Sequence, residues 1–236
     1  MASSPRLNDD SLQQIEQILG HSFADRDLLM TALTHRSFAN EWGDEPPADN
    51  ERLEFLGDAV LDLVVSESLM TTMPTADEGT LTRLRAEVVA LPSLAGLARR
   101  LDLGRFLMLG RGEQRSGGRN KASLLADTME ALIGAVFCDD GYQAARAVAL
   151  PLFTPLLRQA AAREDQDFKS RLQEYLQAER HTLPTYRLVD TSGPAHQRHY
   201  SVDVLVNGEV LGSGSGSSKK AAEQNAAQAA LQVLEQ

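Results

Sequence analysis

The 236-residue chain has little of what defines several protein classes. Its single cysteine, Cys138, excludes an intrachain disulfide framework and is typical of a reducing compartment. No apolar run comes near the roughly 18 residues of a membrane-spanning helix. The start, MASSPRLNDDS, lacks the basic and apolar segments of a secretory signal. These absences predict a cytoplasmic protein without a membrane partner.

A surplus of basic residues is also missing. The chain has 23 Lys and Arg against 33 Asp and Glu, which gives a formal net charge of −10. Cut after Arg163, it carries 16 basic and 23 acidic residues before the cut, and 7 basic and 10 acidic residues after it. Because nucleic-acid phosphates attract cations, any binding to a nucleic acid must rest on local basic patches.

Two segments of different pattern divide the chain. Residues 1–158 repeat apolar side chains at helical spacing, as in Phe55–Val64, and predict an all-α domain. Residues 159–166 are charged and weakly periodic, so we place a linker there. Residues 167–236 predict a small α+β domain of the order α-β-β-β-α, with its elements at Phe168–Arg180, Thr185–Asp190, His199–Val206, Glu209–Gly212 and Ser218–Leu234.

Glycine marks two places in this second domain. Asn207-Gly208 is a strong signal for a two-residue hairpin between the second and third strands. The segment GSGSGS at residues 212–217 is expected to be flexible. Ser218 is expected to cap the last helix.

Three carboxylates share one face of a predicted helix. In Asn50–Asp58, NERLEFLGD, the side chains of Glu51, Glu54 and Asp58 fall within an arc of about 60°. Apolar neighbours such as Phe55 predict that this helix is largely buried, where three carboxylates repel one another and lose hydration. A divalent cation would offset both costs, and an all-oxygen site suits Mg²⁺ or Mn²⁺. The alternative for these three acids alone is a solvated helix face.

A second acidic pair favours the metal site over the solvated face. Asp127 and Glu130 stand three residues apart in LLADTMEALIGAVF, which is too apolar for an ordinary exposed face. Neither helix has the Glu-x-x-His motif of a di-iron bundle, and no His or Cys lies at the spacing of a structural zinc site. An oxygen-only magnesium site indicates phosphate chemistry. Glu78 is an additional candidate, although an acid in the first turn of a helix also compensates the helix dipole.

The segment NERLEFLGD resembles the signature of the ribonuclease III family, endonucleases that cleave double-stranded RNA. The resemblance continues through Ala32–Ser37, Asp77–Gly79, Leu109–Gly118 and Ser123–Gly134. Residues 167–236 resemble the double-stranded-RNA-binding domain that follows the nuclease domain in bacterial members. The resemblance covers nearly the whole chain and implies a nuclease domain followed by an RNA-binding domain.

The resemblance implies roles for the acidic residues. Glu54, Asp58, Asp127 and Glu130 match the residues around the catalytic Mg²⁺, and Asp58 and Glu130 match the pair most directly tied to hydrolysis. The implied reaction hydrolyses an RNA phosphodiester and leaves a 5′-phosphate and a 3′-hydroxyl. The implied cellular roles are ribosomal-RNA precursor processing and messenger-RNA turnover.

The resemblance also implies a homodimer. One site cuts one strand, so cleavage of a duplex calls for two sites, and their stagger leaves short 3′ overhangs. Glu51 and Glu78 match further acids that organise the metal or water and contact the substrate. Phe55 is either a core residue or, by resemblance, a dimer contact, and the sequence leaves both open.

Three regions of the C-terminal domain match RNA contacts of the family. They are Lys169, Gln173 and Glu174 in the first helix, His196 in the loop Gly193–His196, and Ser218, Lys219 and Lys220 at the start of the last helix. Proteins recognise A-form RNA by its shape, 2′-hydroxyls and phosphates, so a few local contacts reconcile an acidic chain with an RNA partner.

The sequence leaves the roles of some residues unassigned and offers two alternative functions. Arg111–Lys121, the most basic stretch of the first domain, is either a phosphate contact or a plain surface turn. His35 and Arg36 match the family without a role that their sequence context explains, and helix packing is the favoured account. The alternatives to an endonuclease are a non-catalytic RNA-binding or assembly factor, which the presence of Asp58 and Glu130 disfavours, and a hydrolase of small nucleotides, which would gain nothing from an RNA-binding domain.

Overall fold

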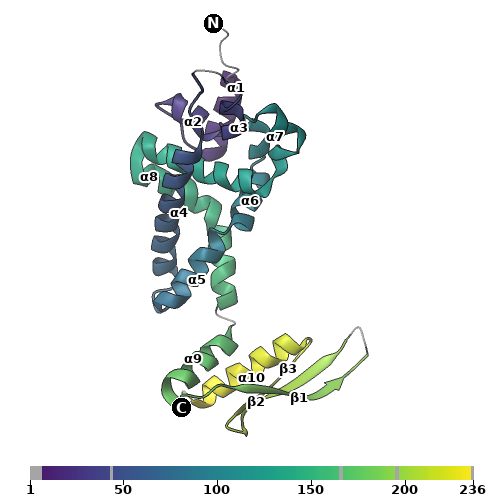
Figure 1. Cartoon of the computed structure of the whole chain (residues 1–236). Helices are drawn as coiled ribbons and strands as arrows, with labels where there is room; N and C mark the ends of the chain where they lie inside the picture. Colours follow the sequence, from purple (N-terminus) through teal and green to yellow (C-terminus); the bar gives the residue numbers. More distant parts are fainter. Residues whose placement is uncertain (1–6, 43–44, 165–166, 195–196, 235–236) are drawn as a thin grey trace. The chain divides into compact units, whose positions relative to one another are not determined.

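The computed structural model describes residues 7–42, 45–164, 167–194 and 197–234 (Figure 1). Its backbone contacts divide the chain into two compact units, Met1–Ala160 and Ala161–Gln236. Across the described ranges, none of the helices combines the length and apolar character that a membrane span requires.

The first unit is helical, as the apolar spacing predicts. Its α-helices are α1 (Asp9–Leu19), α2 (Arg26–Ala32), α3 (Arg36–Ala39), α4 (Glu51–Thr72), α5 (Glu78–Val88), α6 (Leu91–Arg100), α7 (Arg111–Arg115) and α8 (Ala122–Glu164), with short 3-10 helices η1 (Leu103–Phe106) and η2 (Gly118–Asn120). Asp140 and Gly141 have non-helical backbone angles, which kink α8 into two parts. Residues 159–164, which lie inside the predicted linker, continue α8.

A single apolar core holds these helices together. Ile15, Leu61, Leu125 and Phe153, from α1, α4 and the two parts of α8, are each no more than 1% exposed. Full burial of one such side chain contributes about 1.5–3 kcal/mol to stability. The core therefore fixes α4 and α8, the two helices that carry the predicted metal ligands.

The prediction that the signature helix is largely buried is wrong for one of its faces. Phe55 is 82% exposed, Leu63 54% and Met70 64%. Their spacing of eight and seven residues places them within an arc of about 80° on α4. Phe55 is therefore not a core residue of its own chain. Cys138 is likewise exposed, although its apolar neighbours indicate core.

The second unit has the predicted α-β-β-β-α order. Its elements are α9 (Phe168–Arg180), β1 (Thr185–Ser192), β2 (His199–Val206), β3 (Glu209–Gly216) and α10 (Lys219–Leu234). The strands form one antiparallel sheet in the order β1-β2-β3, against which α10 packs (Figure 1). Asn207 and Gly208 both have positive φ, 52° and 86°, as a type I′ hairpin turn requires.

The expectation of flexibility at GSGSGS is wrong, because residues 209–216 form strand β3. A Cβ at Gly212 would lie 2.6 Å from the Ala230 amide nitrogen, and one at Gly214 2.6 Å from the Asn225 carbonyl carbon. The facing side of α10 is built from buried alanines, namely Ala222, Ala226, Ala227 and Ala230. These glycines therefore serve close packing of strand against helix.

Candidate active site

Two glycines let helices α4 and α8 cross with their backbones in contact. A Cβ at Gly57 would overlap the carbonyl oxygen of Glu130, and a Cβ at Gly134 would overlap the carbonyl oxygen of Leu53. Only a residue without a Cβ fits either position. Because Gly57 lies between the acids of α4 and Gly134 lies one turn after Glu130, the crossing falls at the acidic residues. The residue pattern alone does not reveal this role, although Gly57 stands inside the signature segment.

This crossing brings three of the predicted acids together. Glu54 of α4 and Asp127 and Glu130 of α8 each offer a carboxylate oxygen, and the three oxygens lie within 4.8 Å of one another. All three side chains are half-buried. We call these residues the acidic cluster. Carboxylate oxygens completed by water are the ligands that Mg²⁺ and Mn²⁺ prefer, so the donor set fits a divalent metal ion.

Burial and mutual repulsion favour the protonated forms of these acids. Burial raises the pKa of Glu130 to about 8, with further contributions from the charges of Asp58, Glu54 and Asp127. Burial is also the main cause that raises the pKa of Glu54, where Asp127, Glu51 and Asp58 add to it. Burial raises the pKa of Asp127, an effect that a positive charge on His35 would partly offset. A divalent cation between them would favour the ionised forms and remove the repulsion.

The other three predicted acids lie outside the acidic cluster. Asp58 is exposed on α4, yet its charge acts on both Glu54 and Glu130. The exposed Glu51 forms an ion pair with Arg36, at 3.0 Å between Oε1 and Nη1. Glu78 begins α5, where its Oε1 accepts a hydrogen bond from the Thr82 hydroxyl at 3.0 Å.

The basic stretch Arg111–Lys121 separates into two kinds of residue. Arg119 Nη1 donates to the carbonyl oxygens of Gly104, Arg105 and Leu107 at 2.9, 3.0 and 2.9 Å. Lys121 Nζ pairs with Glu113 Oε1 at 2.9 Å. Arg119 therefore holds the fold together, whereas Lys121, although paired, is exposed like Arg111 and Arg115 of α7. Of this stretch, Arg111 and Arg115 are the exposed arginines that a phosphate could contact.

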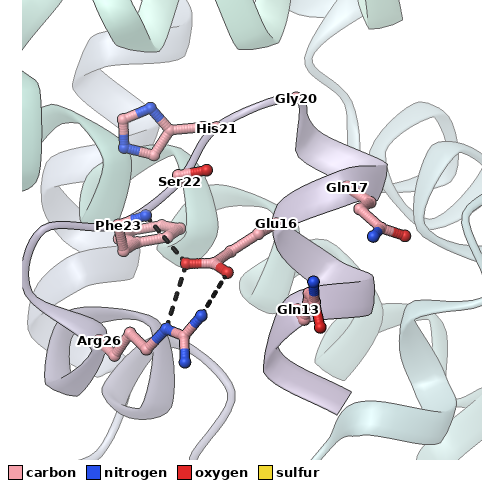
Figure 2. Close-up of a pocket in the computed structure, with 8 residues that line it drawn as sticks. All are labelled: Gln13, Glu16, Gln17, Gly20, His21, Ser22, Phe23 and Arg26. Atoms are coloured by element: carbon pink, nitrogen blue, oxygen red, sulfur yellow. Dashed lines mark hydrogen bonds and ion pairs between the residues drawn. The ribbon is translucent and has the colours of Figure 1, made fainter. Parts of the chain in front are cut away.

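A separate hollow of about 520 Å³ lies between α1 and α2 (Figure 2). The buried Glu16 carboxylate in it accepts hydrogen bonds from Arg26 Nη2 at 2.8 Å and from the Phe23 amide at 3.0 Å. The charge of Glu16 is therefore balanced inside the fold. The residues that line this hollow include none of the acidic cluster, and we assign them a structural role.

In the second unit, the first predicted RNA contact is engaged within the fold. Lys169 Nζ pairs with Glu223 Oε2 at 2.6 Å and lies 4.5 Å from the centroid of the Tyr186 ring. Burial raises the pKa of Tyr186 to about 12, with Glu223 and Asp167 adding to it. Lys169 therefore ties α9 to α10 and β1.

The remaining predicted RNA contacts lie at the surface or outside the described residues. Gln173 and Glu174 are exposed on α9. The Ser218 hydroxyl accepts a hydrogen bond from the Ala221 amide at 3.1 Å, as predicted for a helix cap. Lys219 and Lys220 are exposed in the first turn of α10, whereas the prediction for His196 lies outside the described residues.

These features define a class of protein. A helical unit holds a carboxylate site suited to a divalent metal and to phosphate chemistry, and an α-β-β-β-α unit follows it in the same chain. Residues 25–156 match the family model described as ribonuclease-III-like, and residues 168–234 match the double-stranded RNA binding motif. The chain belongs to the ribonuclease III family, which confirms the resemblance of its signature segment.

Close relatives match over nearly the whole chain. The sequence is 50% identical over 231 residues to ribonuclease 3 of Syntrophotalea carbinolica, covering 98% of this chain and all of the relative. It is 46% identical over 228 residues to ribonuclease 3 of Desulforamulus reducens, covering 96% and 93%. The nuclease domain of ribonuclease III from Campylobacter jejuni matches with a TM-score of 0.57 and 43% identity, over 61% of this chain and 96% of that one. This protein is an endoribonuclease that acts on double-stranded RNA.

Proposed function

We propose that Glu54, Asp58, Asp127 and Glu130 hold Mg²⁺, with Mn²⁺ as a substitute, and that RNA is hydrolysed there to 5′-phosphate and 3′-hydroxyl ends. The observation that carries this proposal is the convergence of three carboxylates from α4 and α8 within 4.8 Å. When bound, a divalent ion supplies a Lewis acid that activates water and offsets phosphate charge. The four carboxylates orient that ion, and the half-buried setting of three of them limits competing water.

Each acid has a distinct part in this proposal. Asp58 and Glu130, the two most closely tied to hydrolysis by resemblance, flank Gly57, so the crossing of α4 and α8 fixes their relative position. Glu51, held by Arg36, and Glu78, at the start of α5, are supporting acids that organise water or metal and contact the substrate.

We propose that two copies of this chain form a homodimer through the exposed apolar face of α4. Association would bury the side chains of Phe55, Leu63 and Met70, which are exposed in one chain. An exposed apolar face of this kind marks an interaction site. The structural relative from C. jejuni is described with a region involved in dimer formation. Each acidic cluster then cuts one strand, and the two cuts leave short 3′ overhangs.

The dimer proposal is tested by Phe55→Glu. We expect size-exclusion chromatography with light scattering to show a monomer, and duplex cleavage to fall in parallel. A variant that stays dimeric at micromolar concentration would assign the contact to another surface. Leu183→Glu, which removes an exposed leucine from the second unit, is the matched control and is expected to stay dimeric.

We propose that the RNA-binding domain holds the duplex through the three surfaces matched by resemblance. They are Lys169, Gln173 and Glu174, the loop with His196, and Ser218, Lys219 and Lys220. We divide the chain into 1–158 for the nuclease domain, 159–166 for the linker and 167–236 for the RNA-binding domain. The proposed roles are ribosomal-RNA precursor processing and messenger-RNA turnover in the cytoplasm.

Truncation after Arg163 tests the RNA-binding domain. Because phosphate contacts weaken steeply with salt, we expect cleavage by the truncated chain to fall mainly at physiological salt and less at low salt. A parallel loss of activity by truncated and full-length enzyme as salt rises would contradict this assignment.

The central experiment compares the native protein with Glu130→Gln on a labelled RNA duplex in Mg²⁺. Glu209→Gln, at an exposed position in the second unit, provides the same charge change as a control. We expect staggered products from the native and control proteins and none from Glu130→Gln. Binding without cleavage by all three would favour the assembly factor, and cleavage by Glu130→Gln at the native rate would show that the metal assignment is wrong.

A further inference from the structure

His35 is held rigidly beside the helix that begins the acidic site. Its amide donates to the Met108 carbonyl oxygen at 3.0 Å, and the preceding Thr34 carbonyl accepts the Asn50 amide at 2.9 Å. Asn50 is the residue before α4, which carries Glu54. The Thr34–Asn50 hydrogen bond therefore connects the backbone next to His35 to the start of the signature helix.

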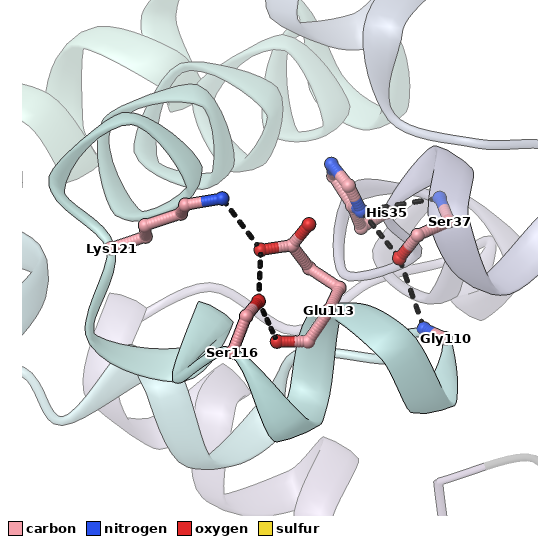
Figure 3. Close-up of polar contacts among 6 residues, drawn as sticks. All are labelled: His35, Ser37, Gly110, Glu113, Ser116 and Lys121. Atoms are coloured by element: carbon pink, nitrogen blue, oxygen red, sulfur yellow. Dashed lines mark hydrogen bonds and ion pairs between the residues drawn. The ribbon is translucent and has the colours of Figure 1, made fainter.

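The hydrogen bonds of the His35 ring fix the position of its proton (Figure 3). The Ser37 amide donates to Nδ1 at 3.1 Å, and the Ser37 hydroxyl lies 2.8 Å from the same nitrogen. The Ser37 oxygen accepts the Gly110 amide at 3.0 Å, so its own proton is directed to Nδ1. Nδ1 is thus an acceptor, and we assign the proton of the neutral ring to Nε2.

The Nε2–H donor is left open. Among the residues that the structure describes, none forms a hydrogen bond with this nitrogen, and Figure 3 shows it on the side of the ring away from Ser37. The ring is half-buried. Its anchors join two helices: the Thr34 carbonyl oxygen accepts the amide of Asn50, which precedes α4, and Ser37 Oγ accepts the amide of Gly110, which precedes α7. His35 therefore lies between the start of α4 and the start of α7.

A neutral donor suits this place better than a cation. An arginine or lysine here would pair with the carboxylates and compete with a metal ion for them, as Arg36 already pairs with Glu51. A neutral N–H carries no net charge, so it competes less with a metal ion for the ionised acids. Pre-oriented donors of this kind stabilise charge that develops on an oxygen, because no reorganisation is needed during the reaction.

We propose that His35 is a further catalytic residue, whose Nε2–H donates a hydrogen bond to a non-bridging phosphate oxygen of the RNA strand cut at the acidic cluster. This inference rests on the proposed metal site. It gives the ALTHRS segment a chemical role: Ser37 and Gly110 orient the ring, and the ring presents its donor to the substrate.

His35 is also the N-cap of α3, where its side chain accepts the Ser37 amide. Two variants distinguish this cap from the Nε2–H donor. In His35→Asn, the side-chain oxygen still accepts the Ser37 amide, since asparagine is a preferred cap residue, but the Nε2 donor is gone. We expect kcat to fall by about 100–1000-fold, with KM, the half-saturating Mg²⁺ concentration and the melting temperature close to native. His35→Gln returns an N–H and is expected to recover part of kcat. His181→Asn, at an exposed position with positive φ, is the control and is expected to cleave normally.

A sulfur substitution tests the contact itself. Replacing each non-bridging oxygen of the scissile phosphate in turn is expected to slow the native enzyme more than His35→Asn at one of the two positions, because only the native enzyme has that hydrogen bond to lose. Equal slowing of both proteins at both positions would overturn the proposal. So would cleavage by His35→Asn within twofold of native, or a loss that added Mg²⁺ restores.

A measurement without a His35 substitution covers the case in which these variants fold poorly. Nitrogen-15 spectra of the chain, which has five histidines, are recorded in the Glu130→Gln background with and without intact duplex. We expect the Nε2-protonated tautomer for His35 and a downfield shift of its proton on binding. The opposite tautomer, or no shift, would overturn the proposal. If Glu130→Gln cleaves at the native rate, the metal site itself is misplaced; if it is inactive while His35→Asn is native-like, only the role of His35 fails.

Discussion

Replacing Gly134 by alanine tests whether the close crossing of α4 and α8 sets the geometry of the acidic cluster. The added Cβ would overlap the Leu53 carbonyl oxygen, and would lie 3.0 Å from the carbonyl carbon of Leu53 and 3.1 Å from the Gly57 nitrogen. Carbon atoms in contact prefer about 3.5–4.0 Å. All of these neighbours are backbone atoms of α4, and the overlap with the Leu53 carbonyl oxygen is the most severe, so the helices must separate by roughly 1 Å.

This separation affects stability and activity differently. Alanine favours the helix by about 1 kcal/mol over glycine, whereas overpacking costs about 1–3 kcal/mol, so the net loss of stability is expected to be about 0–2 kcal/mol. Glu54 moves with α4, while Asp127 and Glu130 stay with α8. A misplacement of about 1 Å in a catalytic site can cost about 100-fold in rate.

The assay measures kcat, the half-saturating Mg²⁺ concentration and the melting temperature on one preparation. We expect Gly134→Ala to remain folded, to need more Mg²⁺ and to lose about 100-fold in kcat. The control is Gly96→Ala in α6, where no atom lies within 4 Å of the added Cβ. It is expected to cleave normally and to gain about 0.5–1 kcal/mol in stability. A folded Gly134→Ala with native kcat and native Mg²⁺ dependence would refute the reasoning.

Three further predictions follow from the same contacts. The pKa of Glu130 is raised from 4.5 to about 8, so between these two pH values the metal-free native state binds more protons than the unfolded chain. The free energy of unfolding should therefore fall as the pH rises from 4.5 to about 8. Metal binding should then release a proton near pH 7, with apparent affinity rising up to about tenfold per pH unit and levelling above about 8, as calorimetry in two buffers would show; a pH-independent affinity would contradict this. Gly214→Ala should destabilise the second unit by about 1–3 kcal/mol in denaturant unfolding, because the new Cβ would overlap α10, and native stability would refute the packing argument. Lys169→Met should cost about 1–3 kcal/mol by leaving Glu223 without its cation; adding Glu223→Gln should restore stability but not RNA affinity, and full recovery of both would make Lys169 a structural residue alone.

Local sequence patterns predicted most of the helices and strands, because the geometry of the local backbone determines the spacing of apolar residues in each. The bounds of Phe168–Arg180 and His199–Val206 agree between prediction and structure, since helical spacing and strand alternation are properties of a few neighbouring residues. The positive φ at Asn207 and Gly208 is equally local. Strand β3 differs, because its glycines are explained only by the alanine face of α10, a helix that begins after the strand has ended.

The face of α4 shows a second limit of pattern analysis. Periodicity shows that Phe55 and Leu63 share a side of the helix with each other, but it does not show what covers that side. Among the described residues of one chain, nothing covers Phe55 and Leu63 fully, and the apolar content of the segment alone did not indicate this. Lys169 illustrates the same limit in a polar contact, because its partner Glu223 is 54 residues away in sequence.

The sequence by itself determined which carboxylates are available and on which helices they lie, because residue identity and helical spacing fix both. It also carried the signature segment and the order of the two domains. Only the tertiary structure decided that Glu54 meets Asp127 and Glu130 while Glu51 turns to Arg36, and that the ring of His35 is anchored to Ser37 with its other nitrogen open. The physical reason is that such contacts join segments far apart in the chain, and their distances depend on how closely helix backbones pack, which at this site is set by Gly57 and Gly134.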